Sequence, residues 1–223
     1  MAVTKYAYVR EYEVATEHFL LKNSFIVVRL DGHNFHKFVQ THNFFKPNDK
    51  RGLDLMVESA KEVMREFYPN IPIAYGQSDE FSFIFKRDAK MHKRRQNKIT
   101  SILVSVFTSA YVFNWNKYFN SFSENESHLN VELKYPPSFD ARCVLYSTID
   151  EVIDYMKWRQ VDCHINNLYN TTLSTMTGEY TTWPLPDNRP KDTFKFYTSK
   201  EATKKLSGTV KKDKHEIMFT DYH

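Results

Sequence analysis

Cysteine and glycine are scarce in this sequence. Among its 223 residues are only two cysteines, Cys143 and Cys163, which show no Cys-x-x-Cys spacing. Neither a disulfide framework nor a structural zinc site is therefore predicted, and we expect both thiols to be reduced. The chain also has only five glycines, which argues against a low-complexity sequence.

Long apolar runs are absent as well. No apolar stretch approaches the ~20 residues that span a bilayer. The first ten residues lack the apolar core of a signal peptide. We therefore predict no membrane partner and expect a cytoplasmic or nuclear location, with a mitochondrial one left open.

The composition that is present predicts a folded globular protein. Charged residues make up 26% of the chain and aromatic residues 16%, which argues against disorder, and the length fits one principal domain. The net charge of +4 is too small to establish a nucleic-acid partner. Basic residues gather in two stretches, 86–98 and 204–214. Taken alone, each fits a solvated face as well as an anion site.

Two short acidic elements stand where strands are expected to end. Asp31 follows the apolar run 25–30, and Asp79 lies between the alternating runs 71–75 and 81–85. If these strands are neighbours in one sheet, two carboxylates lie side by side, an arrangement that suits magnesium. Both elements also have ordinary turn chemistry, so the local pattern alone leaves a plain strand end and hairpin open.

Apolar periodicity predicts the remaining elements. We expect strands at 25–30, 71–75, 81–85 and 139–146, and helices at 52–67, 93–118 and 149–172. The first helix is predicted to bury Leu53, Met56, Val57, Ala60, Met64 and Phe67. This order predicts an α+β fold, a four-stranded antiparallel sheet of the ferredoxin-like kind with two helices on one face. That topology brings Asp31 and Asp79 to one edge of the sheet.

Positively charged residues lie at the start of the second predicted helix. Arg94, Arg95 and Lys98 lie on neighbouring positions of one face. Positive charge at a helix start opposes the macrodipole and hints at an anionic ligand.

Several longer motifs carry a family resemblance. They are Arg29-Leu30-Asp31-Gly32-His33-Asn34-Phe35-His36, Lys46-Pro47-Asn48-Asp49, Tyr75-Gly76-Gln77-Ser78-Asp79-Glu80, Lys93-Arg94-Arg95 and the segment from Trp158 to Asn170. Together with Leu206-Ser207-Gly208-Thr209 and 214–219, they closely resemble the tRNA-histidine guanylyltransferase family. The resemblance implies a palm-like fold related to ordinary polymerases. It divides the chain into a catalytic domain, 1–148, and a C-terminal helical extension, 149–223, which form one compact unit.

The resemblance also implies an activity. Family members are magnesium-dependent nucleotidyltransferases that add G to the 5′ end of tRNA-histidine. ATP adenylylates the 5′-phosphate, the 3′-hydroxyl of GTP attacks it, and pyrophosphate is then removed. ATP and GTP are thus expected as substrates, tRNA-histidine as the RNA partner, and a homotetramer as the assembly.

Site residues follow by the same resemblance. Asp31, Asp79 and the Gly32 carbonyl are expected to hold two Mg2+ ions, and Glu80 either tunes that site or pairs with a nearby cation. The nucleotide-binding residues are expected to be Asp31, Gly32, His33, Asn34, Phe35, His36, Lys46, Asn48, Asp49, Ser78, Asp79, Arg94, Arg95 and Lys98. RNA contacts are expected from His164, Asn166, Asn167 and Asn170, for which helix packing and capping is the alternative.

Three departures from the family pattern stand out. The family often has arginine or lysine at the position of His33, so a phosphate contact there would depend on pH. Where the family continues the third helix with an apolar run, this chain has a threonine- and proline-rich stretch, for which we predict a loop insertion at about 173–197. The chain also ends at His223, before the family's usual tail, which indicates truncation or a divergent member.

Three alternatives remain open at this stage. A sister enzyme of the family could repair the 5′ ends of other tRNAs or non-coding RNAs by templated addition. A non-catalytic RNA-binding paralogue would tolerate loss of Asp31 or Asp79. A palm-fold nucleotidyl cyclase would use the same carboxylates without RNA.

Overall fold

The computed structural model describes residues 4–121, 129–179 and 195–222. Its elements in chain order are α1 (Val9–Ala15), β1 (Phe25–Gly32), α2 (Phe35–Thr41), α3 (Lys50–Glu66), β2 (Ile73–Gln77), β3 (Glu80–Phe85), the 3-10 helix η1 (Met91–Arg94), α4 (Gln96–Phe119), β4 (Phe139–Tyr146), α5 (Ile149–Thr177), α6 (Ser199–Leu206) and α7 (Lys211–Tyr222). Within the described residues, no helix has the length and apolar character needed to cross a bilayer.

The strands form one antiparallel sheet in the order β2-β3-β1-β4. β1 lies between β3 and β4, as the ferredoxin-like prediction requires, so the predicted fold class is confirmed. β4 spans 139–146 as predicted, and β1 continues two residues past the predicted strand 25–30, through Asp31 and Gly32.

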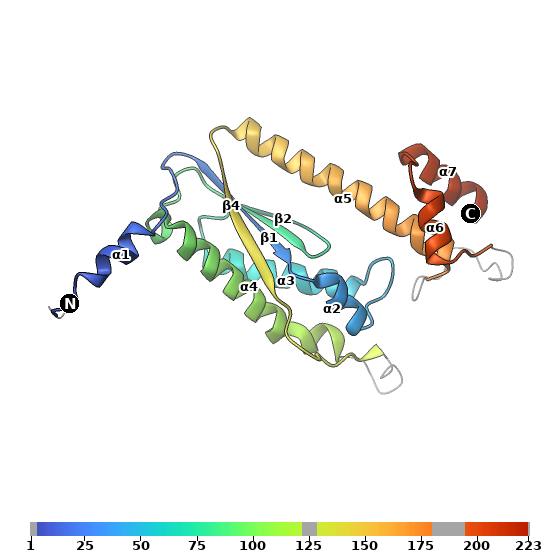
Figure 1. Ribbon diagram of the computed structural model, residues 1–223, viewed down its shortest axis with the longest axis horizontal. Coiled ribbons are helices and arrows are strands. Elements are labelled where there is room, and N and C mark those ends of the chain that lie inside the picture. The colour runs from blue at the N-terminus through green and yellow to red at the C-terminus, as the bar shows by residue number, and fades with distance from the viewer. Residues whose placement is uncertain (1–3, 122–128, 180–194, 223) are drawn as a thin grey trace.

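Helices cover both faces of the sheet. Ile26, Val28 and Leu30 alternate toward α3 and α4, where they join a large core with Phe81, Phe83 and Phe85. Each fully buried apolar side chain of this size contributes about 1.5–3 kcal/mol. Side chains between these positions face α5 on the opposite side, where a smaller cluster contains Val27, Ile84, Val152 and Tyr155. Figure 1 shows α5 crossing this face and continuing beyond the sheet to α6 and α7.

The end of α5 corrects one prediction. Residues 173–177, expected to begin a loop insertion, are helical, and 180–194 of that insertion lie outside the described residues. The hydroxyls of Thr172 and Thr175 donate to carbonyls four residues earlier, which allows both side chains to be buried within the helix. Met176 then packs against α6 and α7 in a third apolar cluster. Threonine content alone did not reveal this tertiary support.

Two predicted helices also need correction. α3 begins at Lys50, because the Asp49 carboxylate accepts from the Arg51 amide and caps it. Its buried face is rotated by about one residue relative to the predicted face, so that Leu53 and Val57, which were predicted to be buried, are 38% and 44% exposed. The face instead buries Gly52, Leu55, Met56, Ser59, Ala60 and Val63.

The second of these helices, α4, begins at Gln96 rather than at residue 93, because the chain first makes a left-handed turn. His92, Lys93 and Arg94 all have positive φ there. Since L-residues rarely adopt that region consecutively, helical periodicity could not continue through them.

The hairpin between β2 and β3 is tighter than expected. The strands pair as far as Gln77 and Glu80, which leaves only Ser78 and Asp79 in the turn. Ser78 supplies the left-handed conformation, with φ 50°. Asp79 is thereby fixed at the tip, one residue from the sheet.

Candidate functional site

The end of β1 and the hairpin tip meet at one edge of the sheet. The Gly32 amide donates to the Asp79 carbonyl at 3.1 Å. A Cβ on Gly32 would lie 2.8 Å from Asp79 Oδ2, so the carboxylate rests over the glycine. Asp31 stands opposite Glu80 in the β1–β3 register. The prediction that Asp31 and Asp79 are neighbours is confirmed.

The Asp79 carboxyl is electrostatically strained in this position. Burial raises its pKa above the usual aspartate value, and the negative charges of Asp31 and Glu80 raise it further. Hydrogen bonds from its own amide and from the Ser78 hydroxyl oppose this rise only in part. A cation placed beside Asp79 would favour the ionised form and relieve the repulsion.

Glu80 is held by arginine. Arg159 of α5 donates from Nε to Glu80 Oε1 at 2.7 Å and from Nη2 to Oε2 at 2.8 Å. Nη2 also donates to Asp162 at 2.9 Å, and the Trp158 ring lies 4.4 Å from the guanidinium carbon. Of the two roles expected for Glu80, pairing with a cation is the one observed.

The donor set fits a magnesium site. Within the described residues, no cluster of three or more His, Cys, Asp or Glu side chains could hold a metal. Magnesium needs no such cage, because it commonly takes one or two carboxylates and fills its octahedron with water and phosphate oxygens. Asp31, Asp79 and the Gly32 carbonyl offer those few hard oxygen ligands, and the two carboxylates lie close enough for the charge of Asp31 to raise the pKa of Asp79.

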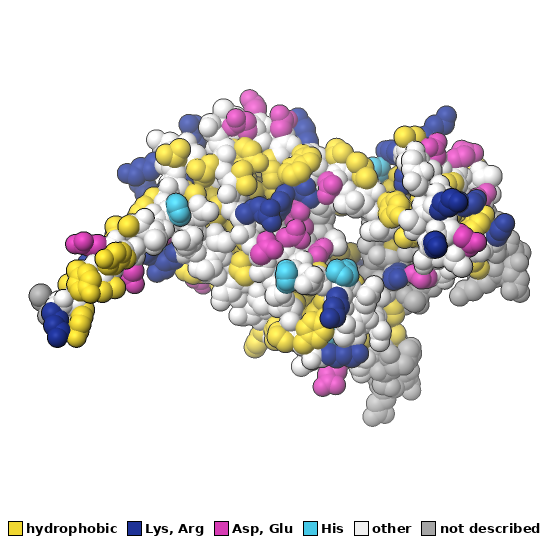
Figure 2. Space-filling view, viewed as in Figure 1, with side chains coloured by type: hydrophobic (Ala, Val, Ile, Leu, Met, Phe, Trp, Pro, Cys, Tyr) yellow, Lys and Arg dark blue, Asp and Glu magenta, His cyan; other side chains and the backbone are white. Residues whose placement is uncertain are grey.

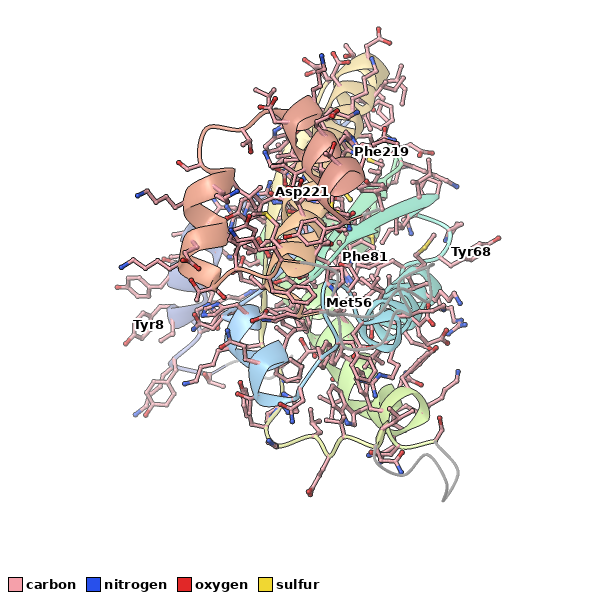
Figure 3. The ribbon with its side chains drawn as sticks, turned by 90° about the vertical axis from the view of Figure 1, so that its right-hand side faces the viewer. Tyr8, Met56, Tyr68, Phe81, Phe219 and Asp221 are labelled. Atoms are coloured by element: carbon pink, nitrogen blue, oxygen red, sulfur yellow. The ribbon has the colours of Figure 1, made fainter. Side chains whose placement is uncertain are left out.

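A pocket of about 690 Å³ adjoins this edge, a volume typical of small-molecule sites. Figure 2 shows acidic and basic side chains gathered near the middle of one face, where the surface is hollowed between the sheet and the C-terminal helices. Figure 3 views the molecule from the side of the C-terminal helices, with Met56 of the pocket wall labelled near its centre. The predicted site residues that line the pocket are Phe35, His36, Lys46, Asn48, Asp49, Ser78, Asp79 and Asn170.

Lys46 and Asp49 of the pocket wall have partners elsewhere in the protein. Lys46 Nζ forms an exposed ion pair with Glu179 at 2.7 Å. Asp49 is buried, and its two oxygens accept from the Arg51 amide, the Arg51 guanidinium and the Phe45 amide. Lys46 can exchange a surface partner for a ligand phosphate, whereas Asp49 shapes the loop that presents Asn48.

Residues 33–36, which follow β1, lie partly in the pocket wall and partly on the surface outside the pocket. Phe35 and His36 open α2, where Phe35 is buried against Gly32 and His36 is exposed in the pocket wall. His33 and Asn34 are exposed and do not line the pocket; the His33 amide donates to Ser138 at 2.8 Å. Asn34 has φ 52°, and this left-handed residue turns the chain from strand into helix.

Arg94, Arg95 and Lys98 do not reach the pocket. Arg94 is buried and donates to the Leu20, Ala89 and Ser24 carbonyls and to the Ser24 hydroxyl. Ser24 precedes β1 and Asp31 lies one residue before its end, so about 20 Å of strand separates them. Arg95 lies 3.6 Å from Glu17 in an ion pair at the same far end. The donors of Arg94 hold the turn before α4, so the structure does not bring this residue to the pocket as a phosphate ligand.

The histidine-asparagine segment lies on α5, and only its last member reaches the pocket. Asn170 lines the wall beside Leu173 and Ser174. Asn166 donates to Asp162 at 3.2 Å, within the helix, and His164 and Asn167 are exposed. The spread over several faces, expected from the spacing, is therefore observed.

Sequence reasoning missed several residues. Arg159 lies within the motif from Trp158 to Asn170, and its i, i+3 spacing to Asp162 was the sequence signal for an ion pair there. Glu179 and Ser199 reach the pocket from beyond the predicted helix end, where local pattern gave no indication. Tyr111 of α4 lies buried between Phe35 and Phe139 below the end of β1, a position that only packing reveals.

Comparison with known proteins agrees with this geometry. The profile described as tRNAHis guanylyltransferase matches residues 6–147, and that described as Thg1 C terminal domain matches 150–187. The chain belongs to the tRNA-histidine guanylyltransferase family. The family resemblance expected from the sequence is thereby confirmed, and membership makes the chain a nucleotidyltransferase by kinship.

Relatives span the whole chain. A probable tRNA(His) guanylyltransferase of Dictyostelium discoideum is 45% identical over 223 residues, covering 100% of this chain and 77% of the relative. The tRNA(His) guanylyltransferase of Schizosaccharomyces pombe is 43% identical, covering 100% of this chain and 74% of the relative. The function predicted from the sequence is the one that these relatives carry in their names.

Solved structures share the fold. The crystal structure of the Saccharomyces cerevisiae enzyme aligns with TM-score 0.79 at 38% identity, covering 97% of this chain and 84% of that one. A bacterial guanylyltransferase-like protein in complex with GTP aligns with TM-score 0.64 at 22% identity, covering 80% of this chain and 79% of that one. At that lower identity, the likeness concerns the fold alone.

Proposed function

We propose that this chain adds guanylate to the 5′ end of tRNA-histidine in a magnesium-dependent reaction that consumes ATP and GTP. One observation carries the proposal: Asp31 and Asp79 meet at a sheet edge beside a pocket of about 690 Å³. Two adjacent carboxylates at the mouth of a nucleotide-sized pocket suit phosphoryl transfer, in which positioning and charge neutralisation supply most of the catalysis.

The proposed role of each site residue follows from its position. Asp31, Asp79 and the Gly32 carbonyl would hold Mg2+, which supplies charge neutralisation for the triphosphate and acidifies an attacking hydroxyl. The apolar wall formed by Phe35, Phe44 and Leu173 would enclose a base. Polar groups of the same pocket would meet phosphate and ribose, namely His36, Lys46, Asn48, Ser78 and Asn170.

RNA would approach along α5. His164 and Asn167 are exposed on the helix that carries Asn170 into the pocket. A 5′ end bound along these residues would therefore point toward Asp79. Lys204, Lys205 and the lysines of α7 add positive charge near the end of the same helix, which favours an RNA backbone.

We also propose the homotetramer expected from the family resemblance. Trp158, Val161 and Ile165 of α5 are each more than half exposed, at 54%, 56% and 58%. Contiguous exposed apolar side chains of this size mark interaction surfaces. Sedimentation equilibrium on the purified protein tests the assembly, and a monomer at micromolar concentration would contradict it.

The decisive experiment uses Asp79→Asn. Incubation with ATP, GTP, Mg2+ and 5′-monophosphorylated tRNA-histidine should extend the RNA by one nucleotide with the wild type. Asp79→Asn should lower transfer at least about a hundredfold, because the metal loses a charged ligand. Asp88→Asn, at an exposed site near the far end of β1, is the matched control and should stay active. Full activity of Asp79→Asn with tRNA binding intact would overturn the proposal.

A further inference from the structure

Tyr111 lies directly beneath the candidate metal site. Its ring contacts Phe35 edge-on, with centroids 6.1 Å apart, and Phe139 with centroids 5.8 Å apart. Phe35 presses against Gly32 from one side, and Phe139 pairs with Gly32 in the β1–β4 register. Tyr111 thus supports the strand end that carries Asp31 and Gly32.

The hydroxyl of Tyr111 is unexplained by the core around it. The side chain is fully buried, and among the described residues its oxygen finds no hydrogen-bond partner. Its surroundings are aromatic, and Phe38 and Trp115 complete them. A phenylalanine would fill this space without desolvating a polar group, a cost of about 1–3 kcal/mol. A buried orphan hydroxyl in such a place indicates a functional partner.

Two carboxylates are near enough to act on this hydroxyl. Burial raises the pKa of Tyr111 far above its usual value, and the charges of Asp49 and Asp79 raise it further. Both aspartates line the pocket. Phe35, which packs on the Tyr111 ring, lines the same pocket, so Tyr111 lies behind the pocket wall and within electrostatic reach of the two acids.

Only one of these acids has acceptor capacity left. A carboxylate offers about four acceptor positions. Asp49 uses four, for the Phe45 amide and for three donors of Arg51. Asp79 receives hydrogen bonds from its own amide and from Ser78. Asp79 is therefore the acid that can take a further donor.

We propose that Tyr111 is a positioning residue for the metal site, its hydroxyl donating through one shared water to the Asp79 carboxylate. A water-mediated hydrogen bond of this kind is nearly as favourable as a direct one. It would hold the carboxylate in the orientation that binds the cation. The inference rests on the proposed function only in taking Asp79 as a metal ligand.

Tyr111→Phe separates this role from a structural one. The variant deletes one oxygen, so its melting temperature without metal should equal or exceed that of the wild type. The Mg2+ concentration giving half of the thermal shift in the presence of GTP should rise about tenfold, the effect of losing one hydrogen bond to a charged group. Tyr118→Phe, the same change on the same helix at a partly buried site, is the control and should alter neither quantity.

A double-mutant cycle locates the partner. If Tyr111 acts through Asp79, Tyr111→Phe should have no further effect on the Mg2+ response in an Asp79→Asn background. An unchanged Mg2+ response in Tyr111→Phe, additive effects in the cycle, or a lowered melting temperature without metal would each overturn the inference. Failure of the proposed function is distinguishable, because a wild type that leaves tRNA-histidine unextended would still show the Tyr111-dependent Mg2+ response.

Discussion

Arg159 grips Glu80 with two donors, at 2.7 and 2.8 Å, and so ties α5 to the sheet one residue from Asp79. Both side chains are nearly buried, with 7% and 11% of their surfaces exposed. This contact sets the position of the helix that carries Asn170 into the pocket. The positive charge of Arg159 also offsets part of the repulsion among the three carboxylates at this sheet edge.

Removing one partner of this pair should destabilise the fold strongly. Arg159→Met removes both hydrogen bonds to buried Glu80 and leaves only the longer contact with Arg29 at 3.9 Å. We expect this loss to cost about 3 kcal/mol in the free energy of unfolding. The double variant Arg159→Met, Glu80→Gln should recover part of that loss. Urea denaturation measures both. Arg142→Met is the matched control, because its pair with Asp140 is 57% and 58% exposed and should contribute less than about 1 kcal/mol. Equal losses at the two sites would contradict the burial argument.

Gly32 is the position where one methyl group should disturb the site. The added Cβ of Gly32→Ala would lie 2.8 Å from both Asp79 Oδ2 and Phe35 Cβ, closer than atoms can pack. We expect the Asp79 carboxylate to shift and the Mg2+ requirement for nucleotide transfer to rise at least about tenfold, since small misplacements at a reacting centre are costly.

Gly208→Ala provides the comparison for that variant. Gly208 has φ 76° with open space around it, so alanine there introduces backbone strain of about 1 kcal/mol without a steric clash. Transfer assays over a range of Mg2+ concentrations should leave this variant close to the wild type. If Gly32→Ala behaves in the same way, the close approach of Asp79 to Gly32 has no functional consequence.

His42 should make stability depend on pH. Its Nδ1 donates to the Phe38 carbonyl at 2.8 Å, and its Nε2 accepts from the Lys134 amide at 3.0 Å, which requires the neutral ring. Burial lowers the pKa of His42 below 6.5, so the unfolded chain binds the proton first as pH falls. The contribution of neutral His42 to the free energy of unfolding is fully present above pH 6.5. It should be lost as the pH falls below that value, by at most about 1.4 kcal/mol per pH unit.

His42→Asn tests the assignment. Melting temperatures between pH 8 and pH 5 should fall less steeply for the variant than for the wild type, although the variant starts from a lower value because it leaves space beside Trp115. Parallel curves for the two proteins would show that another group titrates in this range.

The local sequence pattern predicted the structure correctly where residues adjacent in sequence decide the conformation. The alternation of Phe81, Phe83 and Phe85 placed them on one buried face, and the run 139–146 formed a strand with its predicted bounds. Pattern failed at Thr172 and Thr175, whose burial depends on helices contributed from further along the chain. It failed at Arg94 for the same reason, since the carbonyls that satisfy its guanidinium belong to Leu20, Ser24 and Ala89.

By itself the sequence determined the strand order and therefore the meeting of Asp31 with Asp79, because hydrophobic periodicity and turn chemistry are local and the ferredoxin-like topology follows from their order. The family came from the resemblance of the longer motifs, which are also read directly from the sequence. Only the tertiary structure decided which charges are free to act. Arg159 holds Glu80, and the Leu20 and Ser24 carbonyls hold Arg94, in both cases from distant parts of the chain. Asp79 keeps unused acceptor positions, and the Tyr111 hydroxyl has no partner among the described residues. Desolvation and hydrogen-bond saturation arise from packing in three dimensions, which no local pattern encodes.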